Sequence, residues 1–413
     1  MSESIFGTSY DDIWLVDGLR TGFADYTGAL RDISPTDLGI KVARGVLAQT
    51  GIAAADIDAI VAGNVAQSSF DAYFLPRHIG LYAGLPIDKP SLLVHRLCGT
   101  GFEAILQAAD AIKLGKGRSL LAVGTESMSR NPVASYTHRS GFKMGQVDFR
   151  DFLWEATLDT APDVRMGDTA ENIARHYGIT RAEVDDFAAQ SFARANESAE
   201  FRAGEILPVI SEEFQAEGFK SRSIRLPRGI SSFAEDDHVR PTPLATLAKL
   251  KPAFGPDGVQ TGGNSSAIVD GAGAAIIAQG GFVRDRALSP LARVVAGVAV
   301  GVPPQIMGIG PAPAITNLLK LTGLTLADID RFEINEAFGA QYLGVERELG
   351  LDRAKVNVNG GAIAIGHPLG VSGIRLTLTL ARELKRRGLR YGISSACAGG
   401  GQGIAILVEN PEA

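Results

Sequence analysis

The 413-residue chain has only two cysteines, no long apolar run and no extended block of basic residues. Two cysteines exclude a disulfide framework and favour a reducing compartment, so we expect a cytoplasmic protein. No apolar run reaches the roughly 18 residues of a membrane-spanning helix, and the N-terminus lacks the pattern of a secretory signal. The net charge is −6 and the longest basic run is Lys385-Arg386-Arg387, which argues against a nucleic-acid-binding surface.

Glycine, by contrast, is abundant, with 49 residues against ~29 expected from average usage. Many of these glycines are clustered, which indicates tight turns near a ligand more than a flexible linker. Apolar residues make up 45% of the chain and charged residues 21%, as in ordinary soluble proteins. The length predicts two or three domains.

The first third of the chain alternates between strand-like and helix-like patterns. Buried strands are predicted at 13–17, 57–62 and 119–124, and helices at 35–47, capped by a serine, and at 101–114. Strands that alternate with helices predict an α/β sheet with both faces covered.

The character changes between residues 128 and 265. This stretch begins polar and irregular, is strongly helical at 167–203 and then carries six prolines. Residues 266–285 return to an Ala/Gly-rich pattern, which we interpret as a helix leading into a strand that completes the first sheet. We therefore predict three units: an N-terminal half (1–127 plus 266–288), an inserted domain (128–265) and a C-terminal half (289–413).

The C-terminal half repeats features of the N-terminal half at one offset. The residues Ala-Asp-Ile-Asp at 55–58 recur at 327–330, which is 272 positions later, and Gly101 and Gly373, each opening a predicted helix, are separated by the same 272. Two features at one offset predict a duplicated α/β unit. In this register His367 corresponds to His95.

A turn between the apolar run 91–94 and the helix 101–114 carries Cys98. A thiol at a helix N-terminus faces the positive end of the helix dipole, which favours the thiolate. The alternative from these residues alone is a buried structural cysteine.

Three further turns carry polar groups at strand ends or in glycine-rich surroundings. His367 lies in the glycine-rich stretch 359–370 and is suited to take a proton from a thiol, although a structural turn histidine is the alternative. Cys397 follows the predicted strand 391–395, and the glycines after it offer N–H groups to an oxyanion. Asn335 follows the predicted strand 331–334, where an ordinary helix cap is the alternative.

Two thiols and one imidazole on such turns predict acyl transfer through a thioester. Cys98, His367 and Cys397 would also make three zinc ligands, but oxyanion-type glycines beside both thiols favour nucleophilic catalysis. We therefore expect no metal. The Gly399-Gly400-Gly401 run lacks the Lys-Ser/Thr of a phosphate-binding loop.

Taken together, these motifs resemble those of the thiolase family of acyl-CoA:acetyl-CoA C-acyltransferases over nearly the whole chain. The stretches that carry the resemblance are 126–129 (ESMS), 166–172 (MGDTAEN), 262–266 (GGNSS), 307–311 (MGIGP), 335–338 (NEAF), 366–368 (GHP) and 397–401 (CAGGG). The resemblance implies a thiolase-like α/β fold: two duplicated βαβαβαββ halves in α/β/α/β/α layers, with an inserted loop domain that binds CoA and makes oligomer contacts.

The resemblance also implies a role for each motif residue. Cys98 would carry the acyl group and His367 would activate it, while Cys397 would move the proton of the acetyl-CoA carbon. Asn335 would hold a water in one oxyanion hole, and the N–H groups of Cys98 and Gly399 would form a second.

The remaining implications concern substrate and assembly. Ser266 would meet the pantetheine arm of CoA, and four apolar residues would wall the substrate tunnel: Met166, Met307, Phe254 and Phe338. For each of these four alone, core packing is the simpler explanation. Coenzyme A would be a substrate, with no cofactor, no nucleic acid and no membrane involved, and the protein would form a homodimer or homotetramer.

The stretch 341–405 looks most like the 3-ketoacyl-CoA thiolases of fatty-acid degradation, which is the function we predict. The sequence departs from the family at three points: His95 stands where asparagine is usual, Arg165 where acetoacetyl-CoA-forming members often have histidine, and Val269 where the residue is usually small or polar. The alternatives are a biosynthetic acetoacetyl-CoA thiolase, a decarboxylating ketoacyl synthase, which generally needs a second histidine at Asn335, and an inactive CoA-binding scaffold.

Overall fold

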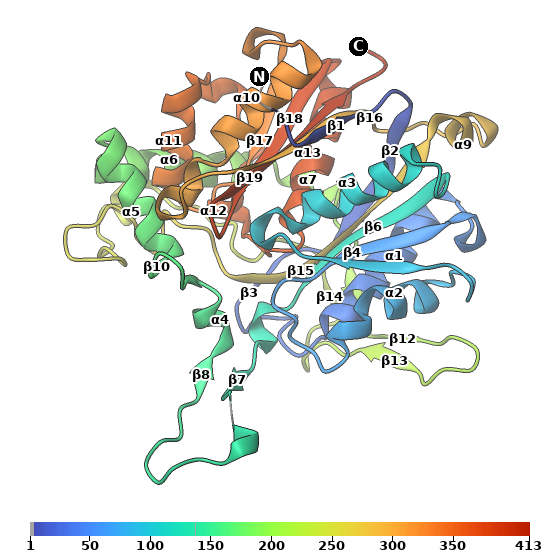
Figure 1. The fold of residues 1–413 in the computed structure, drawn as a ribbon, viewed down its shortest axis with the longest axis horizontal. Helices are drawn as coiled ribbons and strands as arrows, with labels where there is room; N and C mark the ends of the chain where they lie inside the picture. The colour runs from blue at the N-terminus through green and yellow to red at the C-terminus, as the bar shows by residue number, and fades with distance from the viewer. Residues whose placement is uncertain (1–3, 137) are drawn as a thin grey trace.

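The computed structural model describes residues 4–136 and 138–413, and one sheet of 11 strands runs through the body of the molecule (Figure 1). Nine strands follow the order β17-β18-β19-β16-β2-β15-β6-β4-β5, while β1 and β3 pair at its sides. The strands are β1 (Gly7–Ser9), β2 (Ile13–Arg20), β3 (Ala24–Asp25), β4 (Ala59–Gly63), β5 (Ser91–Val94), β6 (Ser119–Glu126), β15 (Val269–Gln279), β16 (Ala292–Gly301), β17 (Arg331–Ile334), β18 (Tyr391–Ala398) and β19 (Gln402–Glu409).

The two halves of this sheet are copies of one unit. Strands β4, β6, β15 and β2 of the first half correspond to β17, β18, β19 and β16 of the second, and the halves join where β2 pairs antiparallel with β16. Strand β18 begins and ends 272 residues after β6. The predicted duplication is confirmed.

Helices cover both faces of each half, which gives the five layers expected of the fold. Helices α1 and α2 pack on the outer face of the first half, α10 and α11 on the outer face of the second, and α3 and α13 lie between the halves. Their bounds are α1 (Pro35–Thr50), α2 (Leu75–Ala83), α3 (Thr100–Lys113), α10 (Pro311–Thr322), α11 (Gly339–Leu349) and α13 (Ser372–Arg387).

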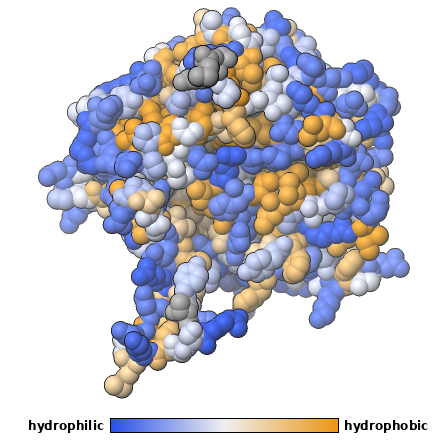
Figure 2. Space-filling model, in the orientation of Figure 1, coloured by the Kyte–Doolittle hydropathy of each residue, from blue (hydrophilic) through white to orange (hydrophobic). Residues whose placement is uncertain are grey.

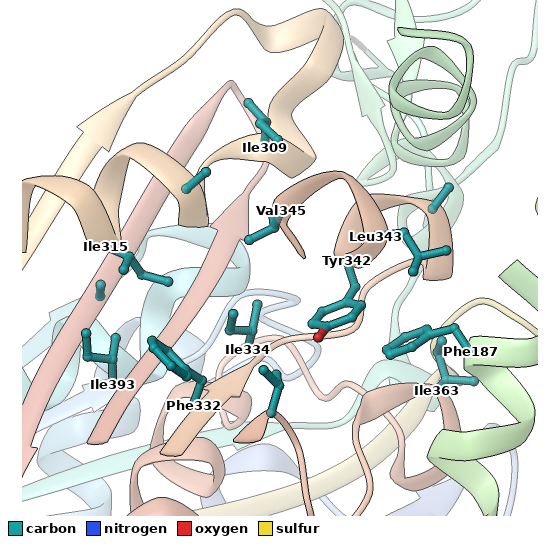
Figure 3. Packing of buried hydrophobic residues seen from close by; sticks show 14 of the residues in the cluster. Phe187, Ile309, Ile315, Phe332, Ile334, Tyr342, Leu343, Val345, Ile363 and Ile393 are labelled. Carbon is teal, nitrogen blue, oxygen red and sulfur yellow. The ribbon is translucent and has the colours of Figure 1, made fainter. Parts of the chain in front are cut away.

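Figure 3 shows the packing under α10 and α11. Ile315 of α10 lies over Ile393 of β18, and Phe332 of the neighbouring strand β17 lies beside Ile393. The rings of Phe187 and Tyr342 stack with centroids 4.2 Å apart. This cluster joins the inserted segment to the second half, because Phe187 belongs to α6 (Arg181–Glu197).

The two central helices cross at a pair of glycines. A Cβ atom on Gly101 would lie 2.8 Å from the backbone N of Gly373, and one on Gly373 would overlap the backbone of Phe102. The helices therefore meet backbone to backbone, which only glycine allows. This contact brings the N-termini of α3 and α13 together, and with them the turns that carry Cys98 and His367.

The chain leaves the sheet after β6 and returns with β15. The excursion contains α4 (Phe152–Glu155), α5 (Met166–Tyr177), α6, α7 (Ala199–Ala203) and α8 (Leu244–Leu247), with the short strands β7 (Val133–Ala134), β8 (Arg150–Asp151), β9 (Leu158–Asp159), β10 (Val164–Arg165), β11 (Val209–Ile210), β12 (Glu212–Phe214), β13 (Arg222–Ile224) and β14 (Ser232–Phe233). Buried ion pairs of Arg20 with Asp236 (2.7 Å) and Glu205 (3.2 Å) fasten it to β2. The boundaries of the inserted domain, residues 128 and 265, stay a prediction.

The Ala/Gly-rich stretch after the excursion was predicted to be a helix leading into a strand, and that order is wrong. Residues 269–279 are all strand, and the short helix α9 (Gly280–Asp285) follows. Strand β15 lies between β2 and β6 with helices on both faces. Small side chains suit a strand that is covered on both sides, and this tertiary setting outweighs their helical propensity.

The second half departs from the predicted βαβαβαββ order at one strand. The first half has β2, α1, β4, α2, β5, α3, β6 and β15 in that order, but between α11 and α13 the second half has only a single parallel bridge, Phe332 with Val356. The short helix α12 (Ala362–Ile365) follows it and leads into the turn at His367.

An arm formed by β7, β8 and the described residues between them projects from the body (Figure 1), and its surface is a mixture of apolar and polar residues (Figure 2). Among the residues that the structure describes, no helix is both long enough and apolar enough to cross a membrane.

Candidate active site

Cys98 lies in a strained turn, the 3-10 segment Leu97–Gly99, directly after β5 and before α3. Leu97 has φ +49°, a left-handed conformation that a branched side chain rarely adopts. The N–H of Arg96 bonds the Thr100 hydroxyl at 2.8 Å, which ties the turn to the helix. The cysteine is therefore presented at the N-terminus of α3, as its sequence context predicts.

A pocket of about 440 Å³ opens beside this turn, and it is lined mainly by apolar side chains. Eight of the ten residues named from the sequence line it: Cys98, Met166, Phe254, Ser266, Met307, Phe338, His367 and Gly399. The other two, Asn335 and Cys397, are fully buried directly behind its wall. The structure thus brings together turns from both halves and the excursion.

Cys397, near the end of β18, packs with Met307 and Ala337 and contacts Met166 and Phe338. Burial raises the pKa of the Cys397 thiol, and the neighbouring Cys98 raises it further. Strand β18 contacts the turn Leu97–Gly99, so the strand that carries Cys397 lies against the turn that carries Cys98.

His367 is held in one tautomer by Ser372. The imidazole Nδ1 lies 2.5 Å from the Ser372 hydroxyl, which itself donates to the Pro368 carbonyl at 3.2 Å. The hydroxyl proton is used in this bond, so the hydroxyl oxygen accepts the Nδ1–H bond and the imidazole lone pair lies on Nε2. Asn335 Nδ2 lies 3.3 Å from Nε2 and donates to it.

The imidazole of His367 is neutral in this setting. Burial lowers its pKa to about 3, and the positive charge of Arg375 acts in the same direction. A neutral imidazole with its lone pair on Nε2 is the form of histidine that accepts a proton.

The expectation that the helix dipole favours a thiolate at Cys98 is wrong for this resting site. Burial raises the pKa of the Cys98 thiol to about 11, although a bond from the Gly399 N–H lowers it. Desolvation of the sulfur outweighs the favourable backbone dipoles. The site therefore holds a neutral thiol beside a neutral imidazole.

A chain of hydrogen bonds fixes the Cys98 turn to the Gly399 loop. The Arg96 guanidinium donates to Gln402 Oε1 at 2.9 Å, and Gln402 Nε2 donates to the Gly399 carbonyl at 3.2 Å. An ion pair with Glu103 at 2.6 Å orients the same guanidinium. The Gly399 N–H is thereby held at the sulfur, where backbone donors can stabilise an oxyanion.

The opposite wall is built by the loop at Ser266 and by two aromatic rings. The Ser266 N–H bonds the Ala337 carbonyl at 3.0 Å. Phe254 and Phe338 meet edge to face, with centroids 6.0 Å apart. A side chain on Gly167 would overlap the Phe254 ring, so the ring lies flat on the start of α5.

The three departures from the family occupy different places. His95 is exposed and does not line the pocket. Arg165 does line it: its guanidinium lies 4.2 Å from the Trp154 ring and donates to the Trp154 carbonyl at 3.0 Å. Val269 contacts Gly366, where a Cβ would lie 2.6 Å from the valine side chain.

Sequence reasoning assigned no role to several residues that build the site, among them Glu126, Glu336 and Ser372. All three are buried and hydrogen-bonded: Glu126 at the end of β6, Glu336 in the turn after β17 and Ser372 at the start of α13. Glu126 and Glu336 lie in stretches that resemble the family, but an acidic residue after a strand is by itself an ordinary surface residue. Within the described part of the chain, no three His, Cys, Asp or Glu side chains gather as a metal site would require.

Comparisons with known proteins agree with this geometry. Residues 13–281 match the family model "Thiolase, N-terminal domain", and residues 288–410 match "Thiolase, C-terminal domain". The human mitochondrial 3-ketoacyl-CoA thiolase is 43% identical, over 96% of this chain and 98% of that protein. An acetyl-CoA acetyltransferase of Allochromatium vinosum is 38% identical, over 97% and 99%.

A solved structure shows the same architecture. The crystal structure of human mitochondrial 3-ketoacyl-CoA thiolase in complex with CoA has a TM-score of 0.89 and 42% identity, over 97% of this chain and 98% of that one. Both family models and these full-length relatives establish that the chain belongs to the thiolase family of acyltransferases.

Proposed function

We propose that the protein cleaves 3-ketoacyl-CoA with CoA to acetyl-CoA and a shortened acyl-CoA, and that it runs the reverse Claisen condensation through the same acyl-cysteine. The observation that carries this proposal is the pairing of a neutral thiol, Cys98, with a neutral imidazole, His367, in one apolar pocket backed by a second thiol. Thioester exchange between thiols is near balance, so a cysteine nucleophile keeps both directions open.

In the first half-reaction His367 Nε2 takes the Cys98 proton while the sulfur attacks the 3-keto carbonyl. The bond between C2 and C3 then breaks, the acyl group stays on sulfur, and Cys397 gives a proton to C2 of the departing acetyl-CoA. The N–H groups of Cys98 and Gly399 stabilise the oxyanion on the attacked carbon. His367 and a water held by Asn335 face the oxygen of the departing enolate.

In the second half-reaction the Cys397 thiolate takes the proton of a CoA thiol, the CoA sulfur attacks the acyl-cysteine, and Cys98 leaves with the proton returned through His367. No metal or organic cofactor takes part. Ser266 contacts the pantetheine arm, and Met166, Met307, Phe254 and Phe338 shape the channel along which it lies. The excursion 128–265 supplies part of this CoA-binding wall.

We assign the protein to the degradative type, acting on chains longer than acetoacetyl. Leu153, Trp154, Leu158 and Ile268 extend the apolar lining beyond the residues named from the sequence. The test is kcat/KM for thiolysis over a series of 3-ketoacyl-CoA substrates lengthened two carbons at a time from acetoacetyl-CoA. A rise with chain length supports the assignment, whereas activity confined to acetoacetyl-CoA would support the biosynthetic alternative.

The protein is further proposed to be a homodimer or homotetramer. Strand β5 ends the sheet and carries the exposed Leu92, and further exposed apolar side chains lie in the segment between β4 and β5: Phe70, Tyr73, Phe74 and Ile87. Exposed apolar residues on the projecting arm offer a second contact. Sedimentation velocity over a range of concentrations measures the assembly, and a monomer throughout would contradict the proposal.

A cytoplasmic or equally reducing location is proposed from the two cysteines, both of which are free thiols. Fractionation of the source cells with an antibody against the protein tests this location. Recovery with an oxidising compartment would contradict it.

A further inference from the structure

The segment 361–370, which carries His367, is pinned at both ends by buried carboxylates. Near its start, Glu336 accepts the N–H of Ile363 at 3.2 Å, and at its end Glu126 accepts the N–H of Gly370 at 2.9 Å. The two side chains come from opposite halves of the sheet, Glu126 from the end of β6 and Glu336 from the turn after β17.

Glu126 has only donors around it. Its Oε1 accepts from Asn64 Nδ2 at 2.9 Å and from the Ala66 N–H at 2.8 Å, and its Oε2 accepts from the Val65 N–H at 3.1 Å as well as from Gly370. Burial raises the pKa of Glu126 to about 7, the backbone N–H groups oppose this shift and the charge of Asp270 adds to it. Because a carboxylic acid would turn its proton towards one of these donors, the hydrogen bonds are best satisfied when the group is ionised, as it is above that pH. No basic side chain pairs with it anywhere in the described chain.

Glu336 has the same character. It accepts from the Ser191 hydroxyl at 2.7 Å and from Asn357 Nδ2 at 2.8 Å, in addition to Ile363. The Ser191 oxygen in turn accepts the N–H of Gly361 at 3.1 Å, and a side chain at Gly361 would overlap the carboxylate. The backbone at the start of the segment therefore packs directly against the Glu336 carboxylate.

We propose that Glu126 and Glu336 are positioning residues that bracket the His367 segment and hold the His367 imidazole in place in the pocket that Cys98 also lines. The proposal rests on the acyl-transfer reaction proposed above but is independent of the chain length of the substrate. Glu126 also fixes Val65, which lines the pocket, so one carboxylate sets both the base and part of the substrate wall.

Replacing either carboxylate by an amide removes the bracket with little change in shape. Glutamine has one accepting oxygen, and its NH₂ group would face the same N–H donors. The segment then relaxes away from these contacts, and a displacement of about 1 Å at a catalytic group costs ~100-fold in rate.

The test compares E126Q and E336Q with the control D330N. Asp330 also accepts two backbone N–H groups, those of Arg390 and Tyr391, but at the other end of β17, away from the pocket. We expect kcat for thiolysis to fall about 10- to 100-fold in E126Q and E336Q, with KM for CoA changed less than about threefold, while D330N stays within about twofold of wild type at a comparable loss of Tm.

A second readout separates positioning from general loosening. The Glu126 charge raises the pKa of the Cys98 thiol, so E126Q moves the pH midpoint of Cys98 alkylation by iodoacetamide downward, whereas D330N leaves it in place. Alkylation of Cys98 needs no turnover, so this measurement tests the proposed role of Glu126 even if the wild-type protein cleaves no 3-ketoacyl-CoA. Absence of thiolysis by the wild-type protein would refute the proposed function and not the role of Glu126.

Two milder variants test the proposal if E126Q or E336Q does not fold. N64A and S191A each remove one donor and keep the carboxylates, and we expect kcat to fall about three- to tenfold, because a bond to a charged group is lost. The proposal is overturned if kcat in the glutamate variants falls no further than in D330N, or if the loss lies in KM.

Discussion

The two halves of the sheet agree in sequence where they build the scaffold and differ where they build the pocket. Gly51 and Gly323 end equivalent helices in the left-handed conformation, with φ of 68° and 70°. Asp58 accepts backbone N–H groups at the start of β6, and Asp330 accepts the equivalent N–H groups at the start of β18. The residue type at such positions is determined by the backbone conformation, which is the same in both copies.

The pocket positions have no such agreement. Cys98 corresponds to Gly370, Cys397 to Thr125 and Asn335 to Gly63 in the 272-residue register. His95 and His367 do share a residue type, yet one is exposed and the other buried beside Ser372. The candidate catalytic residues therefore lie at positions where the two copies differ in sequence. His95 and His367 are the one pair of identical residues, and they are distinguished by exposure and hydrogen bonding.

The strongest contrast is expected at Cys98. C98A removes the proposed nucleophile, so thiolysis should fall more than ~1,000-fold, because no other group can carry the acyl intermediate. Steady-state assays measure the loss, and mass spectrometry should show an acylated protein only in wild type. Full thiolysis by C98A would end the proposed function.

The histidine pair gives the next largest effect. H367N removes the proposed base and should lower kcat about 100- to 10,000-fold. The matched variant H95N changes an exposed side chain outside the pocket and should stay within about twofold of wild type. Equal losses of kcat in H367N and H95N would show that the different surroundings of the two histidines do not give them different roles.

The two thiols should differ from free cysteine in their reaction with iodoacetamide. Because the pKa of Cys98 is raised from 9.0 to about 11, its alkylation at pH 8 should be about 100-fold slower than that of a peptide cysteine and should keep rising above pH 9. Cys397, fully buried, should react more slowly still. A plateau near pH 9 would contradict the raised pKa.

The same shift sets the direction of a stability change. The folded state keeps the Cys98 proton up to about pH 11, whereas the unfolded chain loses it near pH 9.0. Unfolding therefore releases a proton between these values, so Cys98 lowers the free energy of unfolding as pH rises through this window. Denaturation of wild type and C98A across it measures the contribution.

The smallest effect tests the scaffold side of the comparison. G373A places a methyl group on the Phe102 backbone where α3 and α13 cross, and it should lower the free energy of unfolding by about 1–3 kcal/mol. G323A, in the same half, adds a methyl in open space but at a left-handed φ, so its cost of about 1 kcal/mol reflects conformation alone. Chemical denaturation compares them.

Much of this molecule is predictable from local sequence pattern. The apolar runs of β2 and β6, the serine cap of α1 and the helix after Cys98 all lie where their periodicity places them. The turns at Cys98, His367 and Cys397 are recognisable because glycines flank chemically active side chains.

What escaped prediction depends on contacts between distant segments. The partners of Glu126 come from residues 64–66 and from Gly370, and no spacing along the chain connects them. The protonation state of Cys98 follows from burial, which sequence does not measure, and not from its place at a helix end. The strand at 269–279 likewise exists because sheet neighbours lie on both sides.

The missing strand of the second half leaves the two ends of the sheet unlike. At the β17 end, the N–H of Asn357 bonds the Phe332 carbonyl and its side chain bonds the N–H and carbonyl of Ile334, so that edge is already occupied. At the other end, β5 has no ladder partner beyond β4 among the described strands. One open edge limits strand pairing between copies to a single partner, which is compatible with the dimer proposed above and disfavours a ribbon of many copies.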